Sequence, residues 1–105
     1  MARIPVAQLR LNAMLRKQAF LLRDKILSTT RVGNSMLRVT LADRTGTIAG
    51  VMFDVPAHVA ESLVVGGGVE VTGKVGEFRD QLQVNLERIV PTPLPNLEDF
   101  LPSAR

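Results

Sequence analysis

The chain has 105 residues, of which 46% are hydrophobic and 22% charged, as is usual for a globular domain. Thirteen Lys and Arg residues against ten Asp and Glu residues give a net charge of +3 and a pI near 10.2, which permits a nucleic-acid partner without requiring one. The absence of cysteine excludes disulfides and thiolate sites and suits a reducing cytoplasm, and no apolar run approaches the roughly 20 residues of a membrane span.

The first residues are amphipathic, and 1–16 are predicted to form a short helix or an extended arm that packs on the rest of the domain. A helix that binds a membrane surface or a partner is the alternative. Residues 17–28 read as the first strand, centred on Phe20-Leu21-Leu22. The polar stretch 28–35 contains a Gly33-Asn34 turn signal and is predicted to be a loop.

Residues 36–54 carry the clearest pattern, two alternating strands joined by a tight Asp-Arg-Thr-Gly turn at 43–46. Leu37, Val39 and Leu41 share one face of the first of these strands. The opposite, outward register of the two strands consists of Met36, Arg38, Thr40 and Ala42, followed by Thr47, Ala49, Val51 and Phe53.

The period changes after this pair of strands. Asp54 is a good helix N-cap and Pro56 suits a first turn, so a short helix is predicted up to the glycines at 66–68. Its apolar stripe of Val59 and Leu63 is narrow, as expected for a helix that plugs one end of a barrel.

Two more strands follow, at 69–75 and 82–90, with a loop predicted at 76–80. Gly73 falls on the inward register of the fourth strand, where it can mark the bend that closes a small barrel. The proline-rich residues 91–105 read as a linker or as a strap across the barrel. The predicted organisation is therefore 1–16 arm or helix, 17–90 barrel and 91–105 tail.

An all-β chain of five strands with a helix between the third and fourth is typical of the five-stranded oligonucleotide/oligosaccharide-binding (OB) barrel, which favours a binding module over an enzyme. The one histidine, His58, has no nucleophile or second ligand placed near it by the sequence, and a solvated helix residue is the simpler interpretation. The carboxylates lack metal-ligand spacing, so no catalytic group, metal or cofactor is expected.

In such barrels the exposed face of the second and third strands, flanked by loops, binds a single strand through stacking and a basic groove. Only 4% of the residues are aromatic, so the stacking surface is thin. The residues predicted to contact nucleic acid are Lys25, Arg31, Arg38, Thr40, Phe53, Lys74, Phe78, Arg79, Gln83 and Asn85.

A family resemblance rests on Phe20-Leu21-Leu22, the segments 37–48 and 69–75, Phe53-Asp54, and Gln81-Leu82-Gln83-Val84 followed by Ile89. These segments resemble the N-terminal OB domain of bacterial 3′→5′ exoribonucleases that carry an HD phosphohydrolase domain, within the wider tRNA anticodon-binding superfamily. The resemblance implies binding of single-stranded RNA or DNA, with RNA preferred, in or beside such a nuclease. The family's common tryptophan is Phe53 here, and no His-Asp hydrolase motif is present, so catalysis is not carried over.

Three alternatives remain open from the sequence. The apolar face formed by Ala49, Val51 and Phe53 can serve self-association or contact with another domain. The chain can be the binding part of a hydrolase whose active residues lie beyond Arg105. A sugar-binding barrel is disfavoured because the chain has no Trp or Tyr.

Overall fold

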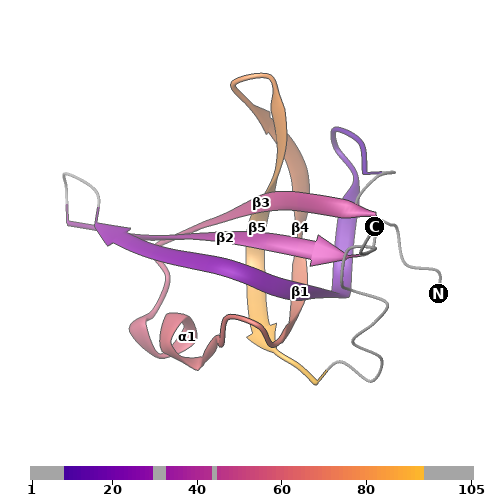
Figure 1. Cartoon of the computed structure of the whole chain (residues 1–105). Helices are drawn as coiled ribbons and strands as arrows, with labels where there is room; N and C mark the ends of the chain where they lie inside the picture. Colours follow the sequence, from indigo (N-terminus) through magenta and orange to yellow (C-terminus); the bar gives the residue numbers. More distant parts are fainter. Residues whose placement is uncertain (1–8, 30–32, 44, 94–105) are drawn as a thin grey trace.

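A computed structural model describes residues 9–29, 33–43 and 45–93, and these form a closed five-stranded barrel (Figure 1). The elements are β1 (Met14–Thr29), β2 (Ser35–Asp43), β3 (Gly46–Phe53), α1 (Ala57–Ser62), β4 (Gly68–Phe78) and β5 (Gln81–Pro91). The strand order around the barrel is β1-β2-β3-β5-β4, and β3 and β5 form its parallel pair. The predicted all-β fold, with one short helix between the third and fourth strands, is confirmed.

The long strand β1 pairs with two neighbours. Its first half pairs with β4 and its second half with β2, and the register shifts between Leu15 and Gln18 and again between Leu22 and Asp24. These irregularities let one strand turn a corner of the barrel. The strand begins at Met14, three residues before the predicted start, and 9–13 contain no helix. Residues 1–8 of the predicted arm lie outside the described residues, as do 94–105 of the tail.

The core follows the alternation read from the sequence. Inward-facing aliphatic side chains from all five strands meet Phe20, which is fully buried, and each such burial contributes on the order of 1.5–3 kcal/mol. Val55, Ala60 and Leu63 come from α1 and its flanks, and they are also buried in this core. The helix therefore closes the lower end of the barrel as drawn in Figure 1.

Gly73 lies where β4 bends. The pairing of β4 with β5 shifts between Thr72 and Gly73, and a Cβ atom at Gly73 would clash with the backbone carbonyl of Asn85. The backbones approach too closely there for any side chain, which agrees with the expected role of this glycine in barrel closure.

The start of α1 differs from the prediction. Asp54 does not cap the helix: it has a φ of +56°, and its N–H donates to the Ser35 carbonyl oxygen at 2.8 Å. Pro56 is the N-cap residue, with no side-chain capping hydrogen bond, and the helix ends at Ser62, before the glycines. The carboxylate is unavailable as a cap because Asp54 adopts the left-handed conformation that turns the chain out of β3.

The loop predicted at 76–80 is a two-residue turn. Strand β4 continues through Phe78, which pairs with Gln81, and only Arg79 and Asp80 connect the strands. Their φ angles of +53° and +66° are those of the tight turns whose twist matches a hairpin. The resulting β4–β5 hairpin rises above the barrel in Figure 1.

Candidate nucleic-acid interface

The pairing of the strands places four predicted positions in one row across the outer surface. Arg38 on β2 pairs with Val51 on β3, which pairs with Asn85 on β5, which in turn pairs with Lys74 on β4. The three polar side chains are exposed, whereas Val51 is only 8% exposed. We attribute its burial to the longer side chains that flank it on both sides. The continuous apolar face predicted from Ala49, Val51 and Phe53 is therefore not formed.

A second row runs parallel to the first. It consists of Thr40 on β2, Ala49 on β3, Gln83 on β5 and Gly76 on β4. A Cβ atom at Gly76 would lie 2.6 Å from Nδ2 of Asn85, so the Asn85 amide lies over this glycine. Of the two strand neighbours of Gln83, Gly76 is covered by this amide, so the open space beside Gln83 lies on the side of Ala49.

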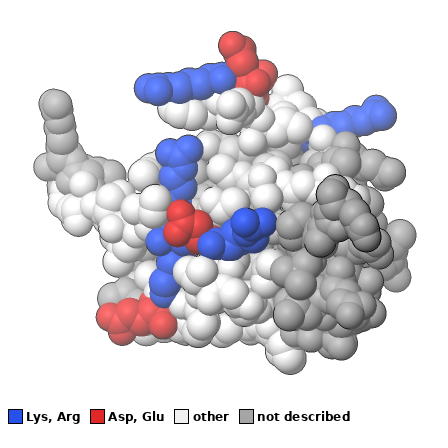
Figure 2. Space-filling model, viewed as in Figure 1, with Lys and Arg blue, Asp and Glu red and all other residues white. Residues whose placement is uncertain are grey.

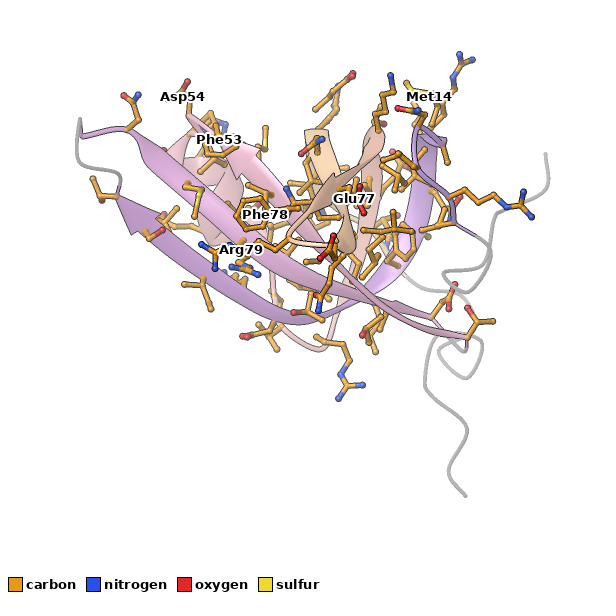
Figure 3. The ribbon with its side chains drawn as sticks, turned by 90° about the horizontal axis from the view of Figure 1, so that it is seen from above. Met14, Phe53, Asp54, Glu77, Phe78 and Arg79 are labelled. Carbon is orange, nitrogen blue, oxygen red and sulfur yellow. The ribbon has the colours of Figure 1, made fainter. Side chains whose placement is uncertain are left out.

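Two phenylalanines are exposed near these rows. Phe53, at the end of β3, is 62% exposed, and Phe78, at the tip of β4, is 51% exposed. The guanidinium carbon of Arg79 lies 5.1 Å from the centroid of the Phe78 ring, within the range of a cation–π contact. Figure 3 shows these side chains from above, with Phe78 and Arg79 together and Met14 far to one side. Phe53 lies four residues after Ala49 on β3, which corresponds to about 13 Å along the strand at the usual rise per residue.

A pocket of about 200 Å³ lies between this surface and the hairpin, and we call it the hairpin pocket. Its lining consists of Arg38, Ala49, Phe78, Arg79, Gln81, Leu82 and Gln83. Three of these residues are absent from the predicted contacts: Ala49, which was predicted only to face outward; Gln81, which stands beside the loop predicted at 76–80; and Leu82, which alternates along its strand with the core residues Val84 and Leu86. Leu82 is 36% exposed because the hairpin extends beyond the barrel.

Charge is mixed on the face of the molecule that Figure 2 draws. Figure 2 shows Lys and Arg side chains scattered among acidic ones and wide uncharged areas, without a continuous basic surface. The basic residues of the two rows and the hairpin are Arg38, Lys74 and Arg79. Any binding of phosphates by this face therefore depends on a few individual contacts.

Lys25, a predicted contact residue, is not part of this surface. The ammonium group of Lys25 donates to the carbonyl oxygens of Ala60 at 2.9 Å and Leu63 at 2.5 Å, so it caps the end of α1. Arg31 lies outside the described residues. Ala42 faces outward but is fully buried in a small cluster with Leu21, so it presents no surface.

Other hollows and side-chain groups among the described residues are weaker candidates for a binding site. A hollow of about 490 Å³ lies between 66–68 and 91–93, where most residues are glycine or proline, and one of about 340 Å³ lies beside α1 near the exposed His58. Within the described ranges, no group of three acidic or histidine side chains is placed to hold a metal ion. No helix in that part of the chain is long and apolar enough to cross a membrane.

Comparison with known families decides the assignment. The model of the OB-fold nucleic acid binding domain family, named for the tRNA anticodon-binding type, matches residues 20–92. The chain belongs to this family. The matched part of this OB-fold domain runs from the core of β1 to just after β5 and so includes the two rows and the hairpin.

Solved structures resemble the OB-fold domain over most of its length. The single-stranded DNA binding protein from Thermus aquaticus is 28% identical, with a TM-score of 0.63, and the match covers 74% of this chain and 40% of that one. The second OB-fold domain of replication protein A from Methanococcus maripaludis is 18% identical, with a TM-score of 0.56 over 89% of this chain and 95% of that one, and supports the fold alone. No curated protein matches the sequence.

Proposed function

We propose that the domain binds single-stranded nucleic acid along the outer surface of β2, β3 and β5, beneath the β4–β5 hairpin. The observation that carries this proposal is that exposed Arg38 and Phe78 line one pocket with carboxamides of β5, and exposed Phe53 lies farther along β3 on the same outward register. A guanidinium binds phosphate, and an exposed ring stacks on bases of any sequence. Family membership and the likeness to a single-stranded DNA binding protein support the same ligand class.

The role of each side chain follows from its place. Arg38 would contact the phosphate backbone as the strand crosses β2, and Thr40 and Asn85 would donate or accept hydrogen bonds beside it. Phe53 and Phe78 would each stack one base, with Arg79 covering the far side of the Phe78 ring. Stacking of this kind contributes about 1–3 kcal/mol per base.

We further propose that the natural strand is RNA and that the domain works within or beside a 3′→5′ exoribonuclease of the HD type. The family resemblance given above supports this part. The chain spans about 40% of the length of the Thermus aquaticus protein, which leaves room for other domains in such relatives. Binding of U and dU oligomers of equal length compares the sugars, and degradation of a U-rich RNA by such a nuclease, with and without the chain, tests the partnership. Equal decay rates would contradict the partnership.

Fluorescence anisotropy at low and physiological salt tests the main proposal. Binding should weaken as salt rises, and Arg38→Ala should weaken it further and reduce the salt slope by about 0.7, the value for one phosphate contact on a single strand. Arg88→Ala is the matched control, because Arg88 lies beside α1 and not on this surface. Equal effects of the two variants would remove Arg38 from the site. A salt-insensitive dimer without nucleic-acid binding would instead favour self-association through Phe53.

A further inference from the structure

The second half of β1 has one unpaired edge. The strand bonds to the backbone of Gly66 and Gly67 through Leu22, and beyond this point it pairs, within the described residues, only with β2. Figure 1 shows this end of β1 extending past β4 and β5. Ile26 and Leu27 lie on opposite faces of it and are 54% and 53% exposed. An exposed strand edge flanked by apolar side chains is a template for pairing with another strand.

The hydrogen-bond pattern identifies the backbone groups at this edge. The Asp54 N–H donates to the Ser35 carbonyl oxygen, so alternate residues of β2, starting from Ser35, bond to β3, and the residues between them bond to β1. The residues of β1 whose N–H and C=O groups point away from β2 are therefore Lys25, Leu27 and Thr29. Among the described residues, the N–H and C=O of Leu27 have no partner at this edge.

A second copy of the same edge complements these groups. Antiparallel pairing about a two-fold axis at Leu27 places Leu27 opposite its equivalent, so that each N–H donates to the other carbonyl oxygen. The same register places Thr29 opposite Lys25, and the Thr29 N–H then donates to the Lys25 carbonyl oxygen in both directions. The Lys25 N–H needs no partner there, because it already donates to Oδ1 of Asp24 at 2.9 Å.

The side chains of this register are compatible with the pairing. The two Leu27 side chains meet on one face of the sheet, and Ile26 of each copy lies opposite Ser28 on the other face. Lys25 is the one charged residue of 25–29, and its ammonium group is bound to α1, so no like charges face each other. We propose that two copies of the chain form a dimer by antiparallel pairing of residues 25–29 of β1.

This dimer has a consequence for the proposed function. Ile26 pairs with Arg38 and shares its outward register. A two-fold axis perpendicular to the sheet keeps the outward registers of both copies on one side. Two single-strand surfaces would then lie side by side and form one longer site. This consequence rests on the proposed function, whereas the dimer itself does not.

Sedimentation equilibrium without nucleic acid, at low and high salt and up to roughly 1 mM protein, tests the inference. The unaltered chain should form a reversible dimer that salt does not weaken, because no ion pair contributes to it. Leu27→Pro removes an N–H that does not bond to β2, and Leu27→Lys places two ammonium groups opposite each other. Each variant should raise the dimer Kd at least about tenfold while the chain stays folded. Val64→Lys is the matched control, because Val64 is 65% exposed in the segment between α1 and β4, and it should leave the Kd unchanged.

Hydrogen exchange tests the register of the pairing. Exchange of the Leu27 and Thr29 amide hydrogens should slow as the protein concentration rises, whereas that of Lys25, which already donates to Asp24, should not change. A chain that stays monomeric over the whole concentration range would overturn the inference and leave the proposed function intact. A dimer that the two Leu27 variants do not weaken, or that Phe53→Ala weakens instead, would also overturn it.

Discussion

Lys25 and Lys74 are both basic and were both predicted to contact nucleic acid, but the structure gives them different roles. The ammonium group of Lys25 donates two hydrogen bonds to carbonyl oxygens at the end of α1, from a half-buried position. A hydrogen bond from a charged donor contributes about 1.5–3 kcal/mol when buried, and exposure to solvent reduces this value. Lys25→Met should therefore lower the free energy of unfolding by about 1–2 kcal/mol and the melting temperature by about 4–10 °C. Urea and thermal unfolding followed by circular dichroism measure both changes.

Lys74→Met is the control for this prediction. Lys74 is exposed on β4, and a substitution there should change stability by less than about 0.5 kcal/mol. In binding assays Lys74→Met should have the larger effect: it should reduce the dependence of nucleic-acid binding on salt, whereas Lys25→Met should leave this dependence unchanged. Equal stability of the two variants would refute the assignment of Lys25 to the helix.

Three further predictions concern binding, barrel closure and the turn between β2 and β3. Phe53→Ala and Phe78→Ala should each raise the Kd for a single-stranded oligomer by about 5- to 150-fold in anisotropy, because each removes a stacking ring. The melting temperature should stay unchanged, since both rings are more than half exposed. An unchanged Kd would exclude stacking on that ring. Gly73→Ala should lower the free energy of unfolding in urea by about 1–3 kcal/mol, because the new methyl group meets the backbone of β5. Gly76→Ala is the control and should lower it less, because its methyl group meets only the movable Asn85 amide. Equal losses in the two variants would contradict the role of Gly73 in barrel closure. The Asp43 carboxylate accepts hydrogen bonds from the Thr45 N–H at 2.8 Å and from the Thr45 hydroxyl at 2.6 Å. Asp43→Ala should therefore lower the free energy of unfolding in urea by about 1–2 kcal/mol, and Asp43→Asn should lower it by less.

The sequence predicted the strands well because alternation reports directly on a half-buried strand. The hairpin of β2 and β3 is paired from Met36 with Phe53 to Asp43 with Gly46, as the pattern at 36–54 indicated. The same alternation misled at Leu82, which lies on the predicted face but on a hairpin that extends past the core. The glycine at 76 suggested a loop, yet it lies within β4, where the Asn85 amide lies over it.

The candidate surface was only partly predictable. Alternation indicates which way a side chain points, and it does not indicate what covers it: Val51 and Ala42 both point outward and both are buried. Lys25 could not be placed from the sequence because its partners are backbone carbonyls more than 30 residues away. The hairpin pocket depends on Ala49 lying beside Gln83, and this arrangement requires the parallel pairing of β3 with β5, which no local pattern shows.

The most direct test of the central claim is a map of backbone amide chemical shifts during titration with a short dT or U oligomer. We predict salt-dependent shifts concentrated at Arg38, Ala49, Phe53, Phe78, Arg79 and Gln83, with the amides of α1 unchanged. Shifts centred on α1 and the end of β5, or none at high oligomer concentration, would contradict the assignment of this surface as the nucleic-acid interface.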